Sequence, residues 1–380
     1  MGNKNNKTKN INKEENKEEK KMENKEEKEM ENKEEKKMEN NVGNKFDSNP
    51  LSIHFLKDLI IDSYCRYWCD NTFSLFKSYN DIFYIIYTNS SKSIISFDII
   101  NNKKISEIKH AHNDYITNLR YYFDKENKRD LLISLSEDDN NLKLWNINNL
   151  ECLLNIIKVN KYGWLSSAYF LNDNNNNYII TSNKKIDSNT IIENIKIFDF
   201  NGNVIKRINN SNYSTIFIDT YYDNNLSKIF IITGNEGFNQ SYDYNENKQY
   251  FKYCDNPKEN NRHMCLRIDD TEKIIKMIES SCAGVIRIWD FHSAKLLNKI
   301  DINNEWLYSI CLWNEEYLFV GCKDSSIKLI KLNESKIIKN LTGHTNKVLT
   351  IKKIKLPKYG ECLISQDADY SQIKLWKISI

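Results

Sequence analysis

One short pattern returns seven times along the chain, at intervals of 41 to 53 residues. Each copy alternates apolar and polar residues and ends in an aromatic side chain followed by an acid, or in substitutes for these two. An alternation with period two indicates a β-strand with one buried face. The seven copies are Ile94–Ile99, Leu142–Ile147, Ile195–Phe200, Gln240–Tyr244, Ile286–Phe291, Ile327–Leu332 and Ile373–Ile378.

Further short strand-like runs lie between these copies. In the last unit, Lys336–Leu341, Val348–Ile354 and Glu361–Ile364 precede the copy at Ile373–Ile378, which makes four strands per unit. Four-stranded units at this spacing are typical of a β-propeller. We therefore expect an all-β fold over residues 50–380, a propeller of seven four-stranded blades.

The first forty-five residues have a different composition. They hold 13 basic and 12 acidic side chains and almost nothing apolar, and Met22, Met30 and Met38 mark an eight-residue repeat. A coiled coil needs an apolar residue about every 3.5 positions, which is far more than this segment offers. The composition therefore predicts a disordered or transiently helical, low-complexity tail over residues 1–45.

Two units carry residues that resemble the motif of the WD-repeat, or β-transducin-like, propeller family. In that family a His, a Ser, an Asp and a Trp form a hydrogen-bonded network that holds one blade. Buried polar groups of this kind must satisfy one another. The residues that match are His112, Ser134, Asp138 and Trp145 in the second unit, and His344, Ser365, Asp369 and Trp376 in the seventh.

The resemblance also implies how the ring closes. In this family the first strand of the chain completes the last blade, and here that strand would be Ser52–Leu59, paired with Ile373–Ile378. A closed ring leaves no unpaired end blade. Deleting residues 50–60 should therefore destabilise the ring far more than deleting residues 1–45.

Sequence motifs for catalysis are missing. No phosphate-binding loop of the GxxxxGK[ST] or GxGxxG kind occurs, and His110 and His112 have no acidic or thiol partner at the spacing of metal ligands. We expect a protein that is not an enzyme and uses no cofactor or metal. A propeller hydrolase is the alternative from another class, and a cluster of acids at the central pore with measurable turnover would favour it.

Charge and cysteine usage limit the environment and the partners. The net charge is only +3, from 55 basic and 52 acidic residues, so no global field favours nucleic acid or a membrane. Nine cysteines without a CxxC pair suit a reducing compartment, the cytoplasm or the nucleus. No apolar run is long enough to span a membrane. We expect other proteins as partners and no small-molecule substrate.

Antiparallel strands place the loop that carries His344 on one face of the ring, which we call the His side. Large or polar residues that follow such loops should border this face, and Trp and Tyr there suit interface hot spots. The candidate partner-binding residues are Asp114, Tyr115, Trp164, Trp306 and Asn346. The alternative for the tryptophans is packing between blades. The predicted function is a scaffold that binds proteins, with a subunit of an RNA-processing, trafficking or ubiquitin-ligase complex as the more specific alternative.

Overall fold

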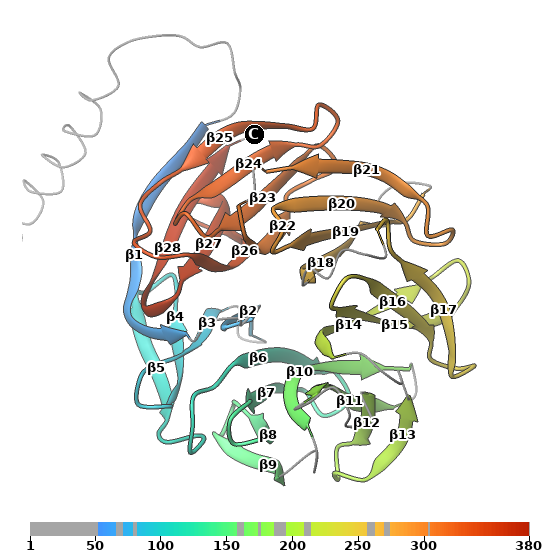
Figure 1. The fold of residues 1–380 in the computed structure, drawn as a ribbon. Coiled ribbons are helices and arrows are strands. Elements are labelled where there is room, and N and C mark those ends of the chain that lie inside the picture. Colours follow the sequence, from blue (N-terminus) through green and yellow to red (C-terminus); the bar gives the residue numbers. More distant parts are fainter. Residues whose placement is uncertain are drawn as a thin grey trace, which may run out of the picture. The chain divides into compact units, whose positions relative to one another are not determined.

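The computed structural model describes residues 52–65, 71–78, 82–157, 163–173, 176–185, 195–208, 214–256, 263–269, 274–302 and 305–379. In these residues the chain forms 28 strands and no helix. The strands make seven four-stranded antiparallel sheets, so the predicted all-β, seven-bladed propeller is confirmed (Figure 1). The predicted tail at residues 1–45 lies outside the described residues.

Each blade contributes one strand to each of four positions, counted outward from the middle of the ring. The innermost strands are β2 (Phe73–Lys77), β6 (Asn118–Asp124), β10 (Gly163–Asn172), β14 (Thr215–Asp223), β18 (His263–Asp269), β22 (Leu307–Leu312) and β26 (Val348–Leu356). The second strands are β3 (Phe83–Thr88), β7 (Arg129–Ser136), β11 (Asn177–Lys185), β15 (Lys228–Asn235), β19 (Lys276–Ser281), β23 (Tyr317–Cys322) and β27 (Gly360–Asp367).

The seven sequence copies form the third strands, outside the second. These are β4 (Ile94–Asp98), β8 (Asn141–Asn146), β12 (Ile195–Asp199), β16 (Asn239–Asp243), β20 (Val285–Asp290), β24 (Ile327–Lys331) and β28 (Asp369–Ser379). The outermost strands are β5 (Lys103–Ile108), β9 (Glu151–Ile157), β13 (Val204–Ile208), β17 (Lys248–Tyr253), β21 (Leu296–Asp301), β25 (Lys336–Leu341) and β1 (Ser52–Cys65).

Four of the seven copies have an acid after the aromatic position, and this acid has a local role. Asp98 accepts hydrogen bonds from the amides of Ile100 and Asn101 at 2.9 and 3.0 Å, and Asp243 does the same for the two residues at the equivalent place. A short acidic side chain can satisfy the amides of a tight turn in this way. The repeated acid therefore turns the chain from the third strand into the outermost one.

The seventh blade joins the two ends of the described chain. β1 pairs with β28 in antiparallel register from Ser52 opposite Ser379 to Cys65 opposite Asp369. The predicted closure strand is thus confirmed, and it runs six residues beyond the predicted end at Leu59. Figure 1 shows β1 along the outer edge of the blade that contains β26 and β27.

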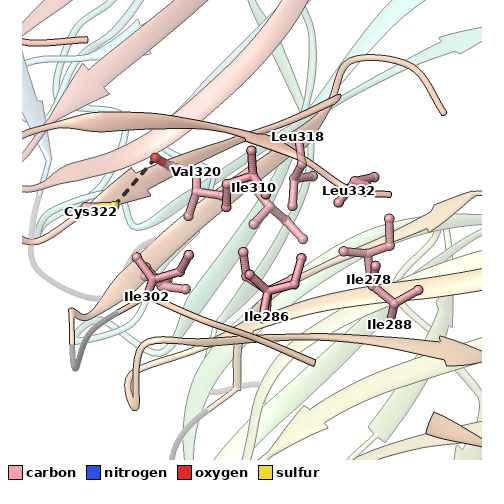
Figure 2. Close-up of a cluster of buried hydrophobic side chains, with 12 residues drawn as sticks. Ile278, Ile286, Ile288, Ile302, Ile310, Leu318, Val320, Cys322 and Leu332 are labelled. Carbon is pink, nitrogen blue, oxygen red and sulfur yellow. Dashed lines mark hydrogen bonds between the residues drawn. The ribbon is translucent and has the colours of Figure 1, made fainter. Parts of the chain in front are cut away.

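The core lies between neighbouring blades. Figure 2 shows one part of it, where Ile286 and Ile288 of the fifth blade meet Ile310 and Val320 of the sixth, all of them buried. Cys322 joins this cluster as a small apolar side chain, and burial raises the pKa of its thiol to about 12. Such interlocking of apolar faces makes each blade depend on its neighbours and makes the ring rigid.

Candidate functional site

His112 and Trp145 meet at the hydroxyl of Ser134 inside the second blade. Trp145 Nε1 donates to Ser134 Oγ at 2.7 Å, and His112 Nε2 lies 2.7 Å from the same oxygen. Burial, with a smaller contribution from the charge of Lys143, lowers the pKa of His112 to about 3. The imidazole is therefore neutral near pH 7, and Nε2 can accept the hydroxyl hydrogen of Ser134.

The seventh blade repeats this arrangement with a carboxylate added. Trp376 Nε1 donates to Ser365 Oγ at 2.8 Å, and His344 Nε2 lies 2.7 Å from that oxygen. Asp367 Oδ2 lies 3.3 Å from His344 Nδ1. Burial would raise the pKa of Asp367, but His344 and nearby backbone amides lower it overall. The network holds the loop between blades six and seven to β27 and β28.

The carboxylates in these contacts differ from those that the sequence motif predicted. Asp139 accepts hydrogen bonds from the amides of Asn113 and Asp114, both at 2.8 Å, and Asp367 accepts from Thr345 at 3.1 Å. Asp138 lies beside Asp139 in the turn before β8, whereas Asp369 already begins β28. Equal spacing from the serine was misleading, because the connection to the third strand is four residues long in the second blade and one residue long in the seventh.

The fifth blade has a buried ion network in the equivalent place. Glu279 lies opposite Arg287 in the sheet, as Ser365 lies opposite Lys374, and both charged side chains of this pair are almost fully buried. Arg287 Nε lies 2.9 Å from Asp255 Oδ1, and Lys299 Nζ lies 2.8 Å from Asp255 Oδ2. Sequence analysis missed this network, although a Glu inside the mainly apolar and small run of β19 was a signal for it.

Tyr115 lies on the His side in an aromatic cluster that joins three blades. Its ring stacks on Tyr64, with centroids 4.5 Å apart and planes inclined by 28°. Lys92 Nζ lies 5.4 Å from the centroid of Tyr115. Tyr64 is the second-to-last residue of β1, Lys92 lies between β3 and β4, and Tyr115 precedes β6. All three side chains are half-buried, so they present a partly exposed aromatic surface with a positive charge beside it.

Trp306 belongs to a second cluster of the same kind. Lys323 Nζ lies 4.7 Å from the centroid of the Trp306 indole, and Lys347 Nζ lies 5.7 Å from that of the neighbouring Tyr308. The two rings are 6.3 Å apart. Trp306 is half-buried and packs partly against Leu349, while Lys323 is exposed. The Trp306 side chain is therefore partly packed between blades and partly exposed on the His side. Each of the two predictions for it describes part of what the structure shows.

The other candidate residues have more limited roles in the structure. Asp114 and Asn346 are half-buried in loops on the His side, and each side-chain oxygen accepts a hydrogen bond from the next residue's amide, at 2.7 and 2.8 Å. Trp164 belongs to β10 and pairs with Lys184, but its side chain lies outside the described ones. Asp114 and Asn346 thus shape their loops.

Within the part of the chain that the structure describes, no three His, Cys, Asp or Glu side chains gather as metal ligands. The same residues include no helix long and apolar enough to cross a membrane.

Comparison with known proteins gives one informative similarity. No protein family model matches the chain. Over 111 residues, or 29% of its length, the chain is 22% identical to the U3 small nucleolar RNA-associated protein 21 homolog of Schizosaccharomyces pombe. The matched stretch covers 12% of that protein. Together with the seven four-stranded blades, the similarity supports a relationship to WD-repeat propellers.

Proposed function

We propose that the protein is a non-catalytic scaffold that binds other proteins through its His side. The observation that carries this proposal is the pair of aromatic clusters on that face, Tyr64–Tyr115 with Lys92 and Trp306–Tyr308 with Lys323 and Lys347. Tyr and Trp are the residues that most often dominate binding energy at protein interfaces. Both clusters lie on loops and strand ends of the arc from the sixth to the second blade, and in the second cluster Tyr308 is buried beneath the half-buried Trp306.

The fold supports this role because the loops are held by a rigid frame. The hydrogen-bonded networks of His112 and His344 fix the loops that lead into the second and seventh blades, next to the two clusters. Preorganised loops lose little conformational entropy when a partner binds. The lysines beside the rings favour a partner with an acidic surface, since complementary charge speeds association.

The similarity to an RNA-associated relative favours a more specific candidate. That relative is by its name a U3 small nucleolar RNA-associated protein. We propose as a second candidate that this chain is a subunit of an RNA-processing complex and acts in the nucleus, bound to protein subunits. Tagging the chain and locating it in its own cells tests this, because a chain excluded from the nucleus would contradict the candidate.

The binding experiment compares the intact chain with a Tyr115→Ala, Trp306→Ala double variant by quantitative affinity capture. Phe55→Ala is the matched control, because Phe55 is an exposed aromatic residue on the outermost strand β1, away from the His side. We expect the double variant to lose partners that the control retains, with both variants folded by circular dichroism. Equal recovery of all partners by the three proteins would overturn the proposed face.

A further inference from the structure

A cavity of about 490 Å³ lies between the first blade (β2–β5) and the second blade (β6–β9). The second blade lines it with two of its turns, through Lys128 between β6 and β7 and through Ile147 and Leu150 between β8 and β9. Because β6 and β8 both start at the His side, the turns that follow them lie at the opposite face. The cavity is therefore a different place from the aromatic clusters of the His side.

The cavity exists because the first blade departs from the repeat. In five of the seven sequence copies the residue before the aromatic position is a buried Leu or Ile, namely Leu144, Ile197, Ile288, Leu329 and Leu375. In the first blade this residue is Ser96, and the residue opposite it on β5 is Ser106. The second blade has Leu144 opposite Leu154 at the same place, and both pack in its apolar core. Two serines in place of two leucines leave volume between the blades that side chains do not fill.

The hydroxyls of these two serines face the cavity without a partner in the protein. The fourth blade also has a serine at this position, but Ser241 Oγ accepts a hydrogen bond from the amide of Phe251 at 3.2 Å and lies 3.1 Å from Tyr253 Oη. In the described part of the chain, neither Ser96 nor Ser106 has such a contact, although Ser96 is only 4% exposed. Buried polar groups are normally hydrogen-bonded, so this pair of hydroxyls indicates a ligand that binds them.

Tyr84 adds a third hydroxyl to the lining. Its ring is held in place because it stacks on Phe76, with centroids 5.0 Å apart, and Phe76 stacks in turn on Tyr121 at 4.1 Å. Burial, followed by the charges of Asp98 and Asp130, raises the pKa of Tyr84, so its hydroxyl stays protonated near pH 7. This hydroxyl also lacks a hydrogen-bond partner among the residues that the structure describes. Each of the three hydroxyls can both donate and accept a hydrogen bond.

The charged residues of the lining favour a neutral ligand. Asp130 is almost fully buried, and its carboxylate accepts hydrogen bonds from Tyr121 at 2.7 Å and from Asn148 at 2.9 Å. These two contacts satisfy the carboxylate but do not neutralise it, so it disfavours an anionic group beside it. Lys128 is exposed on its turn, where water and salt screen its charge.

We infer that this cavity binds a neutral small molecule with an apolar body and a carbonyl, amide or hydroxyl group. Ile105, Ile147 and Leu150 line the cavity with apolar surface for the body, and the three hydroxyls bind the polar group. The volume falls in the range of about 300–1,000 Å³ that is common for small-molecule sites, which are mainly apolar with a few polar groups. This site does not depend on the proposed scaffold function.

The test is equilibrium dialysis of the full chain against naphthamide, with naphthoate as the matched anion of the same shape. Ser96→Leu gives the first blade the residue type that the second blade has at Leu144, and it should fill the cavity. We expect this variant to bind naphthamide at least about tenfold more weakly. Its melting temperature should stay the same or rise, since filling a cavity usually stabilises a protein. Ser91→Leu makes the same change at an exposed turn of the first blade and should bind like the intact chain.

A second variant removes a hydroxyl without filling the cavity. Tyr84→Phe should weaken the binding of naphthamide by about twofold to tenfold, the loss typical of one hydrogen bond. This variant carries the test if Ser96→Leu does not fold, and binding of naphthamide that Tyr84→Phe leaves unchanged would contradict the role of the hydroxyls.

Three further results would overturn the inference. One is that millimolar naphthamide does not bind to the intact chain. Another is that naphthoate binds more tightly than naphthamide, which would mean a site for anions. The third is equal binding of naphthamide by folded Ser96→Leu and by the intact chain, which would place the probe outside this cavity.

Discussion

Glu279 occupies in the fifth blade the position that Ser365 occupies in the seventh. Each lies on the second strand, one opposite Arg287 and the other opposite Lys374. In the seventh blade the serine joins a histidine to a tryptophan, whereas in the fifth the glutamate lies 3.5 Å from the Arg287 guanidinium. At the same position, the seventh blade thus has a His–Ser–Trp hydrogen-bond network and the fifth blade has an ion network.

The serine at this position should be important for stability. Ser365→Ala removes the shared oxygen and leaves two buried ring nitrogens, of His344 and Trp376, without their partner. We expect the free energy of unfolding to fall by about 1–3 kcal/mol, measured by denaturant titration. Ser91→Ala, at an exposed turn, is the control and should change little. An equal effect of both substitutions would contradict the role of the network.

The ion network of the fifth blade should depend more on its buried cation than on its exposed one. Arg287→Met leaves Glu279 buried beside an apolar side chain, and we expect a loss of about 3–5 kcal/mol in unfolding free energy. Lys299→Met removes the other, more exposed partner of Asp255 and should cost less than about 1 kcal/mol. Urea unfolding of both variants measures these two losses. Similar losses would mean that the burial of Arg287 does not determine how much the network contributes to stability.

His112 should make the stability depend on pH. Its pKa falls to about 3 in the folded chain, so on acidification the unfolded chain takes up the proton first. This contribution is complete above about pH 6.5 and is lost as the pH falls toward 3, by up to about 1.4 kcal/mol per pH unit. His112→Gln should flatten the unfolding free energy between pH 7 and pH 5 relative to the intact chain. A slope that His112→Gln leaves unchanged would contradict the assignment.

Loss of the closure strand β1 should strongly lower the stability of the ring. Deleting residues 52–60 removes much of β1 from its pairing with β28 and exposes Ile373 and Trp376. We expect the melting temperature to fall by more than about 10 °C or cooperative unfolding to disappear, since several hydrogen bonds and apolar contacts are lost together. Deletion of residues 1–45 is the control for chain shortening. A melting temperature lowered equally by both deletions would show that β1 does not close the ring, and would also contradict a domain boundary between residues 45 and 50.

Much of this fold could be predicted because strand alternation and turn chemistry repeat in sequence. The third strands follow from local alternation, and the closing strand was implied by the resemblance to the WD-repeat family. The acids that contact the His loops did not follow from either, because Asp138 and Asp139 are neighbours and only the start of β8 decides which one reaches Asn113. Tyr64 was also missed, since its contact with Tyr115 depends on how far β1 continues past Leu59.

The pairing of β1 with β28 has a consequence for the order of events during synthesis. About 300 residues separate these two strands, so at about 5–20 residues per second β1 leaves the ribosome roughly 15–60 s before its partner exists. During that interval one edge of β1 has no strand to pair with in the nascent chain. The seventh blade is therefore the last to be completed, and a cell that makes this protein must shield an early strand from premature association until the final one arrives.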